Sequence, residues 1–165
     1  MNIYLLKFKK LKAYKSSLIF PNILYNITIG LILGDLCVSR RYNNSIAVLK
    51  FGQGISYVEY LLHLYELFDL YVGSLPKVYK INKNNKVYYQ VNFQTLSFIF
   101  FDELRNLFYN EKGVKIIPLN IGDLLTPIGL GYWYMDDGNK LNSTFELHTE
   151  NYTLKEVKLL INVLK

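Results

Sequence analysis

Residues 127–138 read Pro-Ile-Gly-Leu-Gly-Tyr-Trp-Tyr-Met-Asp-Asp-Gly, an apolar run with two glycines that ends in paired carboxylates and a glycine. Residues 27–35, Ile-Thr-Ile-Gly-Leu-Ile-Leu-Gly-Asp, repeat this pattern, and Asp35 and Asp137 lie 102 positions apart. A chain that twice places a carboxylate at the end of a glycine-containing apolar helix is typical of a duplicated unit. We therefore predict two related halves whose carboxylates meet near a pseudo-twofold axis. Such a site suits metal-dependent chemistry on a substrate that is itself nearly twofold.

The elements expected after the first run are a hairpin and a helix. Residues 23–35 are expected to be helical, and residues 36–41 and 45–52 to form the hairpin. Ser56 and Glu59 have the capping-box spacing, in which a hydroxyl accepts a backbone N–H and a Glu side chain reaches back. We therefore predict that Ser56 caps the next helix.

Residues 77–94 carry the clearest strand signal in the chain. Lys83-Asn-Asn-Lys86 is the expected turn, and beyond it the side chains alternate with a period of two. The apolar face is expected to hold Val87, Tyr89, Val91 and Phe93, and the polar face Lys86, Tyr88, Gln90, Asn92 and Gln94. Residues 97–108 then predict an amphipathic helix.

The same order of elements begins again near residue 124. Residues 124–137 predict an apolar helix, residues 140–143 and 144–149 two short strands, and Thr153 with Glu156 a second capping box. The repeat unit is therefore helix, hairpin, helix, hairpin, helix. The capping boxes are 97 positions apart, so the second copy is expected to lack the equivalents of residues 69–108.

The carboxylates at the ends of the two apolar helices are the candidate chemical groups. A negative charge at a helix C-terminus opposes the helix dipole at a cost of roughly 0.3–1 kcal/mol. Asp35, Asp136 and Asp137 accept that cost at matching places, and the acids would also repel one another if the helices pack together. A divalent cation relieves both penalties, and oxygen ligands suit Mg²⁺.

The glycines of these helices predict a close crossing. Gly30, Gly34 and Gly131 are expected to let the two backbones approach, as small residues do in other tight helix pairs. Gly138 is expected to adopt the left-handed conformation that often ends a helix.

Both runs resemble the signature of the LAGLIDADG homing endonucleases, specifically the single-chain branch with two repeats. Residues 28–36 match the nine-residue motif with Asp35 at its eighth place, although Leu36 replaces the usual small last residue. Residues 130–138 match it with Asp137 at the eighth place. Asp136, at the seventh, then resembles a family variant rather than a metal ligand.

The resemblance implies an α+β fold, a pseudo-twofold pair of αββαββα units packed through the two motif helices, here with an incomplete second unit. Residues 1–121 are expected to hold a basic N-terminal arm and the first repeat, and residues 122–165 the truncated second repeat. Members of the family cut both strands of a long DNA site with Mg²⁺ held by the motif aspartates.

Carried over by position, the resemblance gives four catalytic candidates. Asp35 and Asp137 are expected to hold Mg²⁺ or another divalent cation. Lys115, in Lys-Ile-Ile-Pro, resembles the family's active-site base or water-orienting group, and the alternative is one more solvated lysine. Gln53 lies where the family often places a polar residue at the scissile site.

The polar strand face is the predicted nucleic-acid interface. Its amide and charged side chains can contact base edges and phosphates, although such a face is also typical of any half-exposed sheet. The residues expected to bind nucleic acid are Arg40, Arg41, Lys50, Lys77, Lys80, Lys83, Lys86, Tyr88, Gln90, Asn92 and Gln94.

Composition favours an anionic partner. The chain has 165 residues with a net charge of +6, and before Asp35 it has lysines but no acidic residue. This balance suits nucleic acid first and an anionic membrane surface second. No apolar run reaches the ~18–20 residues of a membrane span. The single Cys37 excludes an internal disulfide, and the frequent Asn, Lys and Ile favour a mitochondrial or other organellar gene.

Two functions stay open. The intact Asp35 and Asp137 favour a site-specific DNA endonuclease. The shortened second repeat favours a second chain that completes it, or a non-catalytic remnant that binds RNA, such as a maturase or an organellar ribosome-associated protein.

Overall fold

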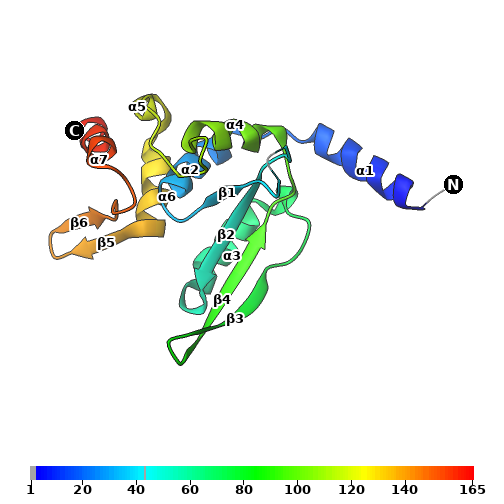
Figure 1. The fold of residues 1–165 in the computed structure, drawn as a ribbon, viewed down its shortest axis with the longest axis horizontal. Helices are drawn as coiled ribbons and strands as arrows, with labels where there is room; N and C mark the ends of the chain where they lie inside the picture. Colours follow the sequence, from blue (N-terminus) through cyan, green and yellow to red (C-terminus); the bar gives the residue numbers. More distant parts are fainter. Residues whose placement is uncertain (1–2, 43) are drawn as a thin grey trace.

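Two helices pack against each other at the centre of the molecule, and both sheets extend from them (Figure 1). The computed structural model describes residues 3–42 and 44–165. The central helices are α2 (Asn22–Leu33) and α6 (Pro127–Asp137). Every residue of α2 from Ile27 onward is buried, which explains why this run carries no charge before Asp35. The predicted α+β class and the central pair of motif helices are confirmed.

A four-stranded antiparallel sheet forms the body of the first half. Its order is β1 (Cys37–Ser39), β2 (Val48–Gly54), β4 (Lys86–Gln94) and β3 (Lys77–Lys83). The β3–β4 turn is the predicted one, and Asn84 and Asn85 both adopt the left-handed conformation that a two-residue hairpin turn requires. Residue 43, in the turn expected before β2, lies outside the described residues.

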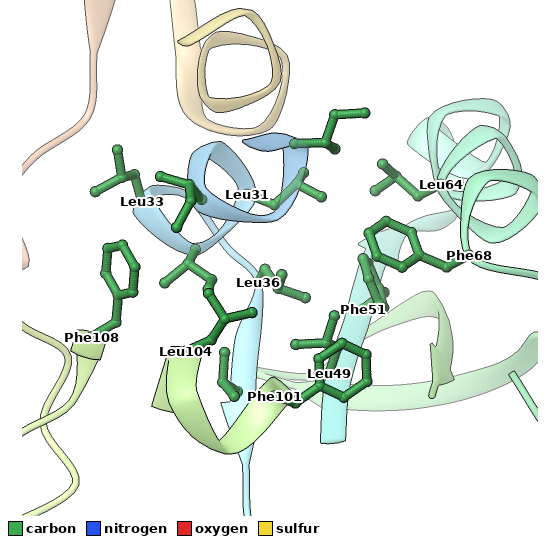
Figure 2. Close-up of a cluster of buried hydrophobic side chains, with 14 of the residues drawn as sticks. Leu31, Leu33, Leu36, Leu49, Phe51, Leu64, Phe68, Phe101, Leu104 and Phe108 are labelled. Carbon is green, nitrogen blue, oxygen red and sulfur yellow. The ribbon is translucent and has the colours of Figure 1, made fainter. Parts of the chain in front are cut away.

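Two helices cover the apolar face of this sheet. They are α3 (Val58–Leu67), which packs on β2 and β4, and α4 (Ile99–Phe108), which packs on β1. Short 3-10 turns, Ile55–Tyr57 and Asp69–Tyr71, flank α3. Figure 2 shows side chains of α2, α3, α4 and the strands pointing into one cluster that includes Leu31, Leu36, Phe51, Phe68, Phe101 and Leu104.

The second half contains a smaller sheet, formed by β5 (Gly138–Leu141) and β6 (Thr144–Leu147). Besides α6, its helices are α5 (Ile121–Leu124) and α7 (Leu154–Val163), which pack on each other. The hairpin begins at Gly138, directly after α6, so β5 starts and ends two residues earlier than predicted, whereas β6 starts at the predicted residue and ends two residues early. Phe145 is 63% exposed in this two-stranded sheet, and its ring meets the ring of Tyr134 in α6 edge-on.

The N-terminal segment forms a helix, α1 (Ile3–Ser17), that extends away from the body (Figure 1). Its last turn is attached to the first half, because the Tyr14 hydroxyl donates to the Leu70 carbonyl oxygen and Lys15 Nζ donates to Ser97 Oγ. Among the described residues, no single helix is long and apolar enough to span a membrane. Residues 10–17 and 22–33 reach that length and composition only when taken together, and they are bent relative to each other.

One of the two predicted capping boxes is wrong. Thr153 and Glu156 form the full reciprocal box at the start of α7. Ser56 instead lies inside the 3-10 turn that leaves β2, and α3 begins after Tyr57 without a side-chain cap. The chain enters α3 through this tighter turn, so Ser56 is one residue too early to be the cap.

Two glycine predictions are also wrong. Gly138 has extended backbone angles (φ −107°, ψ 151°), because α6 continues directly into β5. A side chain there would collide with the Tyr134 ring, so the absence of Cβ matters for packing. Gly131 faces open space, and it is Gly129 that meets Gly30 at the helix crossing.

The polar and apolar alternation of β4 holds only near the core. Val91 and Phe93 are buried as predicted, but Val87 and Tyr89 are about half exposed. The tip of the β3–β4 hairpin extends beyond the helices that cover the sheet, so both faces of the tip meet solvent (Figure 1).

Candidate active site and nucleic-acid interface

The ends of α2 and α6 bring three carboxylates together. Asp35 is exposed, directly after α2, whereas Asp136 and Asp137 end α6. Burial raises the pKa of Asp136 to about 7, and the charges of Asp35 and Asp137 act in the same direction. The pKa of Asp137 is also raised, first by burial and then by the charge of Asp35. The carboxylates of the two halves therefore interact electrostatically, as the repeat predicted.

Lys115 reaches this cluster from the connector between the halves. Its Nζ donates a hydrogen bond of 2.7 Å to the Gly34 carbonyl oxygen. Burial lowers the pKa of Lys115, an effect that the negative charges of Asp35, Asp136 and Asp137 oppose. Lys115 is therefore a partly buried, hydrogen-bonded ammonium group beside the carboxylates rather than one more solvated lysine.

Gln53 is also close to the carboxylates, but it contacts Asp136. Its Nε2 donates to Asp136 Oδ1 at 3.1 Å. Gln53 pairs in register with Val91, so it belongs to the side of the sheet that the helices cover. Its predicted place beside the scissile bond stays a prediction.

The uncovered face of the four-stranded sheet is hollow and polar. A cavity of about 600 Å³ has Asp35 in its wall together with five of the predicted binding residues, Lys50, Lys77, Gln90, Asn92 and Gln94. A neighbouring cavity of about 720 Å³ shares Lys50 and Gln94 and adds Arg41. Gly52 leaves the first cavity open at this point, because a side chain there would collide with the Asn92 amide. The metal-ligand candidate and most of the predicted binding residues thus share one surface.

The strand register extends this face toward the hairpin tip. Lys83 pairs with Lys86, and Tyr88 lies two residues further along β4, so all three share the face of Gln90. Two predicted binding residues do not. Lys80 pairs with Tyr89 and projects to the opposite face. Arg40 lies on the α4 side, where it forms a salt bridge of 2.7 Å with Asp102.

The family model of the LAGLIDADG DNA endonuclease family matches residues 25–165, which include most of α2, all of α6, both sheets and the carboxylates. The chain belongs to this family. The LAGLIDADG assignment agrees with the positions of Asp35 and Asp137 at the ends of the paired helices.

Three members of the LAGLIDADG family illustrate what this chain is similar to. Cytochrome b mRNA maturase bI2 of Debaryomyces hansenii is 34% identical over 139 residues, which cover 82% of this chain and 53% of the relative. The probable intron-encoded endonuclease 1 of Wickerhamomyces canadensis is 35% identical over 145 residues, 81% of this chain and 61% of the relative. The solved structure of the homing endonuclease I-WcaI bound to its DNA recognition sequence superposes with a TM-score of 0.86 at 30% identity.

This LAGLIDADG chain is shorter than these proteins. It spans about half to three-fifths of the two curated relatives and 72% of the I-WcaI chain. The match covers 94% of this chain, so most of the described architecture has a counterpart in a solved member of the family.

Two residues that sequence reasoning did not place in the site also lie there, and Asp136, which was not expected to be a metal ligand, has a contact of its own. Asp136 accepts hydrogen bonds from the Asp35 backbone N–H and from Gln53 Nε2, both in the first half. The Tyr152 hydroxyl donates to the Leu33 carbonyl oxygen at 2.9 Å, and the His148 backbone N–H donates to the Asp137 carbonyl oxygen at 3.0 Å. The His148 ring contacts Glu150, whose carboxylate raises the His148 pKa. A backbone contact of this kind leaves no pattern in the sequence.

The donor set fits a hard divalent cation in this LAGLIDADG site. Asp35 and Asp137 offer carboxylate oxygens, and their mutual repulsion is the kind of penalty that a bound cation relieves. Within the described part of the chain, no three His, Cys, Asp or Glu residues are arranged to hold a metal by themselves. A cation here would therefore need oxygens from water, the backbone or a nucleic-acid phosphate as well. Mg²⁺ usually keeps several waters and substrate oxygens in just this way.

Proposed function

We propose that the protein is a divalent-metal-dependent DNA endonuclease that hydrolyses both strands of a long double-stranded site. The observation that carries the proposal is the position of Asp35 in the wall of the polar, lysine-lined cavity. A carboxylate at the end of a cationic groove suits a phosphodiester backbone that must be bound along its length and attacked at one point. The resemblance to a DNA-bound homing endonuclease supports the same function.

The chain's own residues divide this work. Lys50 and Lys77 neutralise phosphates, and the amides of Gln90, Asn92 and Gln94 are donors and acceptors that can read base edges. Asp35 and Asp137 would hold Mg²⁺, which activates water and stabilises charge on the oxygens of the reacting phosphate. Lys115 supplies a fixed positive charge beside the three carboxylates.

Cleavage of a plasmid library with randomised inserts tests the proposal. The protein should linearise a subset of plasmids with Mg²⁺ and none with a chelator. Asp35→Asn and Asp137→Asn should each abolish linearisation, whereas Asp123→Asn, a change of the same type on the exposed part of α5, should not. Cleavage that survives in both motif variants would overturn the proposal.

A second function has specific support in the maturase relative. Cytochrome b mRNA maturase bI2 shares 34% identity over 82% of this chain, so an RNA-binding role is the second candidate. Nanomolar binding of a structured intron RNA, with no DNA cleavage by the same preparation and no effect of the two Asp→Asn changes, would favour it over the endonuclease.

We also propose that a hairpin and a helix from another polypeptide segment complete the second half. An apolar groove of about 550 Å³ lies between α6 and the β5–β6 hairpin, lined by Leu130, Tyr134 and Phe145 among others. Hydrogen exchange tests this: β5–β6 amides of the isolated chain should exchange far faster than those of β2 and β4. Equal protection would show that the second sheet is stable as it stands.

We propose in addition that the gene is intron-encoded and organellar. The names of the relatives and the asparagine-rich composition support this origin. Mapping the coding sequence should place it in or beside an intron of organellar DNA, and a nuclear locus would contradict the proposal.

A further inference from the structure

One peptide group at the end of α2 is held from both sides by the rest of the protein. Lys115 Nζ donates to the carbonyl oxygen of Gly34 at 2.7 Å, and Asp136 Oδ2 accepts from the backbone N–H of Asp35 at 2.6 Å. This carbonyl and this N–H belong to the same peptide bond. Because a peptide group is planar, fixing both of its ends fixes its orientation.

The Asp136 carboxylate is itself held in place. Its second oxygen, Oδ1, accepts from Gln53 Nε2 at 3.1 Å. Gly34 makes the close approach possible, because a side chain there would lie 2.6 Å from Asp136 Oδ2. Both oxygens are thus engaged by donors of the first half. Asp35 lines the open 600 Å³ cavity, and Asp35 and Asp136 both line a void of about 10 Å³ beside Gln53.

This contact breaks the symmetry of the two repeats. Gly34 and Asp136 both precede a motif aspartate, 102 positions apart, and here they lie against each other. The first repeat provides a glycine, Gly34, which leaves room for a side chain of the other half, and the second repeat provides the Asp136 carboxylate that accepts the hydrogen bond. Among the described residues, the Asp137 backbone has a different contact, through its carbonyl oxygen to His148 N–H.

We propose that Asp136 is a positioning residue that orients the Asp35 carboxylate toward the metal by fixing the Gly34–Asp35 peptide group. The inference rests on the proposed metal-dependent function. It assigns to Asp136 a role that is distinct from metal ligation. Outer-sphere partners of metal ligands are worth about 10–100-fold in metal affinity or activity, which sets the scale of the expected effect.

The test compares Asp136→Ala with Asp136→Asn. Alanine removes the acceptor. Asparagine keeps it, because its oxygen can accept from the Asp35 N–H while its NH₂ donates to a flipped Gln53 amide. The readouts are Mn²⁺ affinity, measured by electron paramagnetic resonance, and the amide resonance of Asp35 in ¹⁵N-aspartate-labelled protein. Asp123→Asn is the matched control on the exposed part of α5.

Asp136→Ala should weaken Mn²⁺ binding about 10–100-fold and move the Asp35 amide resonance upfield, as expected for a lost hydrogen bond. Asp136→Asn should keep the resonance and stay within about fivefold of the parent affinity, which corresponds to roughly 1 kcal/mol. Should Asp136→Ala not fold, Gly34→Ala carries the same test, because it keeps the carboxylate but displaces it from the Asp35 N–H.

Three results would overturn the inference. Equal loss of Mn²⁺ affinity in the Ala and Asn variants would make Asp136 a ligand. An unchanged Mn²⁺ affinity in folded Asp136→Ala would make its role structural only. An Asp35 amide resonance that does not move in Asp136→Ala would mean that Asp136 does not accept a hydrogen bond from the Asp35 N–H. Asp35→Asn separates this outcome from failure of the proposed function: if it also binds Mn²⁺ normally, the metal assignment itself is wrong.

Discussion

Gly30 is a residue at which the two central helices approach each other closely. A Cβ at this position would lie 1.8 Å from the Gly129 carbonyl oxygen, which is backbone and cannot move aside as a side chain could. Gly131 lies in the same central pair, yet a Cβ there would meet nothing within 4 Å. Two glycines of similar sequence context thus have opposite structural demands.

Gly30→Ala should destabilise the protein by more than the roughly 1–3 kcal/mol of a typical overpacked core, because backbone must separate. Gly131→Ala should be neutral or stabilising by up to about 1 kcal/mol, the helix-propensity difference between the two residues. Urea denaturation measures both free energies of unfolding. Equal effects at the two positions would contradict the described crossing.

Asp136 gives the protein a defined pH dependence in metal-free buffer. Its pKa is raised from 3.8 to about 7 in the folded state, so the folded protein binds this proton more tightly than the unfolded chain. The resulting stabilisation is full below pH ~4 and is lost as the pH rises through ~7.

Asp136→Asn lacks this proton, so the variant should gain about 1–3 kcal/mol in free energy of unfolding relative to the parent between pH 5 and pH 8. Urea denaturation at the two pH values, with a chelator present, measures the difference. Parallel pH profiles of parent and variant would mean that Asp136 is not buried as described. Because the pKa of Asp137 is also raised, the free energy of unfolding of both proteins should still fall with rising pH, by a smaller amount.

At the scale of single elements, the start of a helix depends on backbone geometry that spacing alone does not define. Ser56 and Thr153 each precede a Glu by three residues, but only Thr153 Oγ1 accepts from a helix N–H. Thr153→Ala should therefore cost about 1 kcal/mol in free energy of unfolding. Ser56→Ala, on an exposed 3-10 turn, should cost less than ~0.5 kcal/mol. A larger loss of free energy of unfolding in Ser56→Ala would indicate that Ser56 caps α3 after all.

The two faces of β3 make a matched comparison for nucleic-acid binding. Lys77 lines the polar cavity, whereas Lys80 projects to the other face. If DNA lies on the polar face, Lys77→Ala should weaken non-specific binding and reduce the slope of log affinity against log salt by about 1, while Lys80→Ala should change neither. Fluorescence anisotropy across a salt series gives both quantities. Equal losses would place DNA along the hairpin edge instead.

At the scale of the whole molecule, the duplication could be predicted from the sequence because two long apolar runs, each ending in an aspartate, form the central helix pair. The β3–β4 hairpin was readable because Asn84-Asn85 favours a two-residue turn. Counting back from this turn also puts Lys80 on the face away from Lys83, so its position in the sheet follows from the sequence as well.

Other features depend on contacts between distant segments. The Lys115–Gly34 hydrogen bond joins residues 81 positions apart, and the Asp136–Asp35 bond joins residues 101 apart. Neither follows from local periodicity. Their existence depends on how closely α2 and α6 approach, which Gly30 and Gly129 determine.

The central claim is that Asp35 and Asp137, from different halves, form one divalent-metal site. A double-mutant cycle of Mn²⁺ affinity tests this most directly, with Asp35→Asn, Asp137→Asn and the double variant, each shown to be folded. The account predicts that each single change removes most of the affinity and that the double variant binds no more weakly than the weaker single one. Fully additive losses, or high-affinity binding that persists in either single variant, would contradict it.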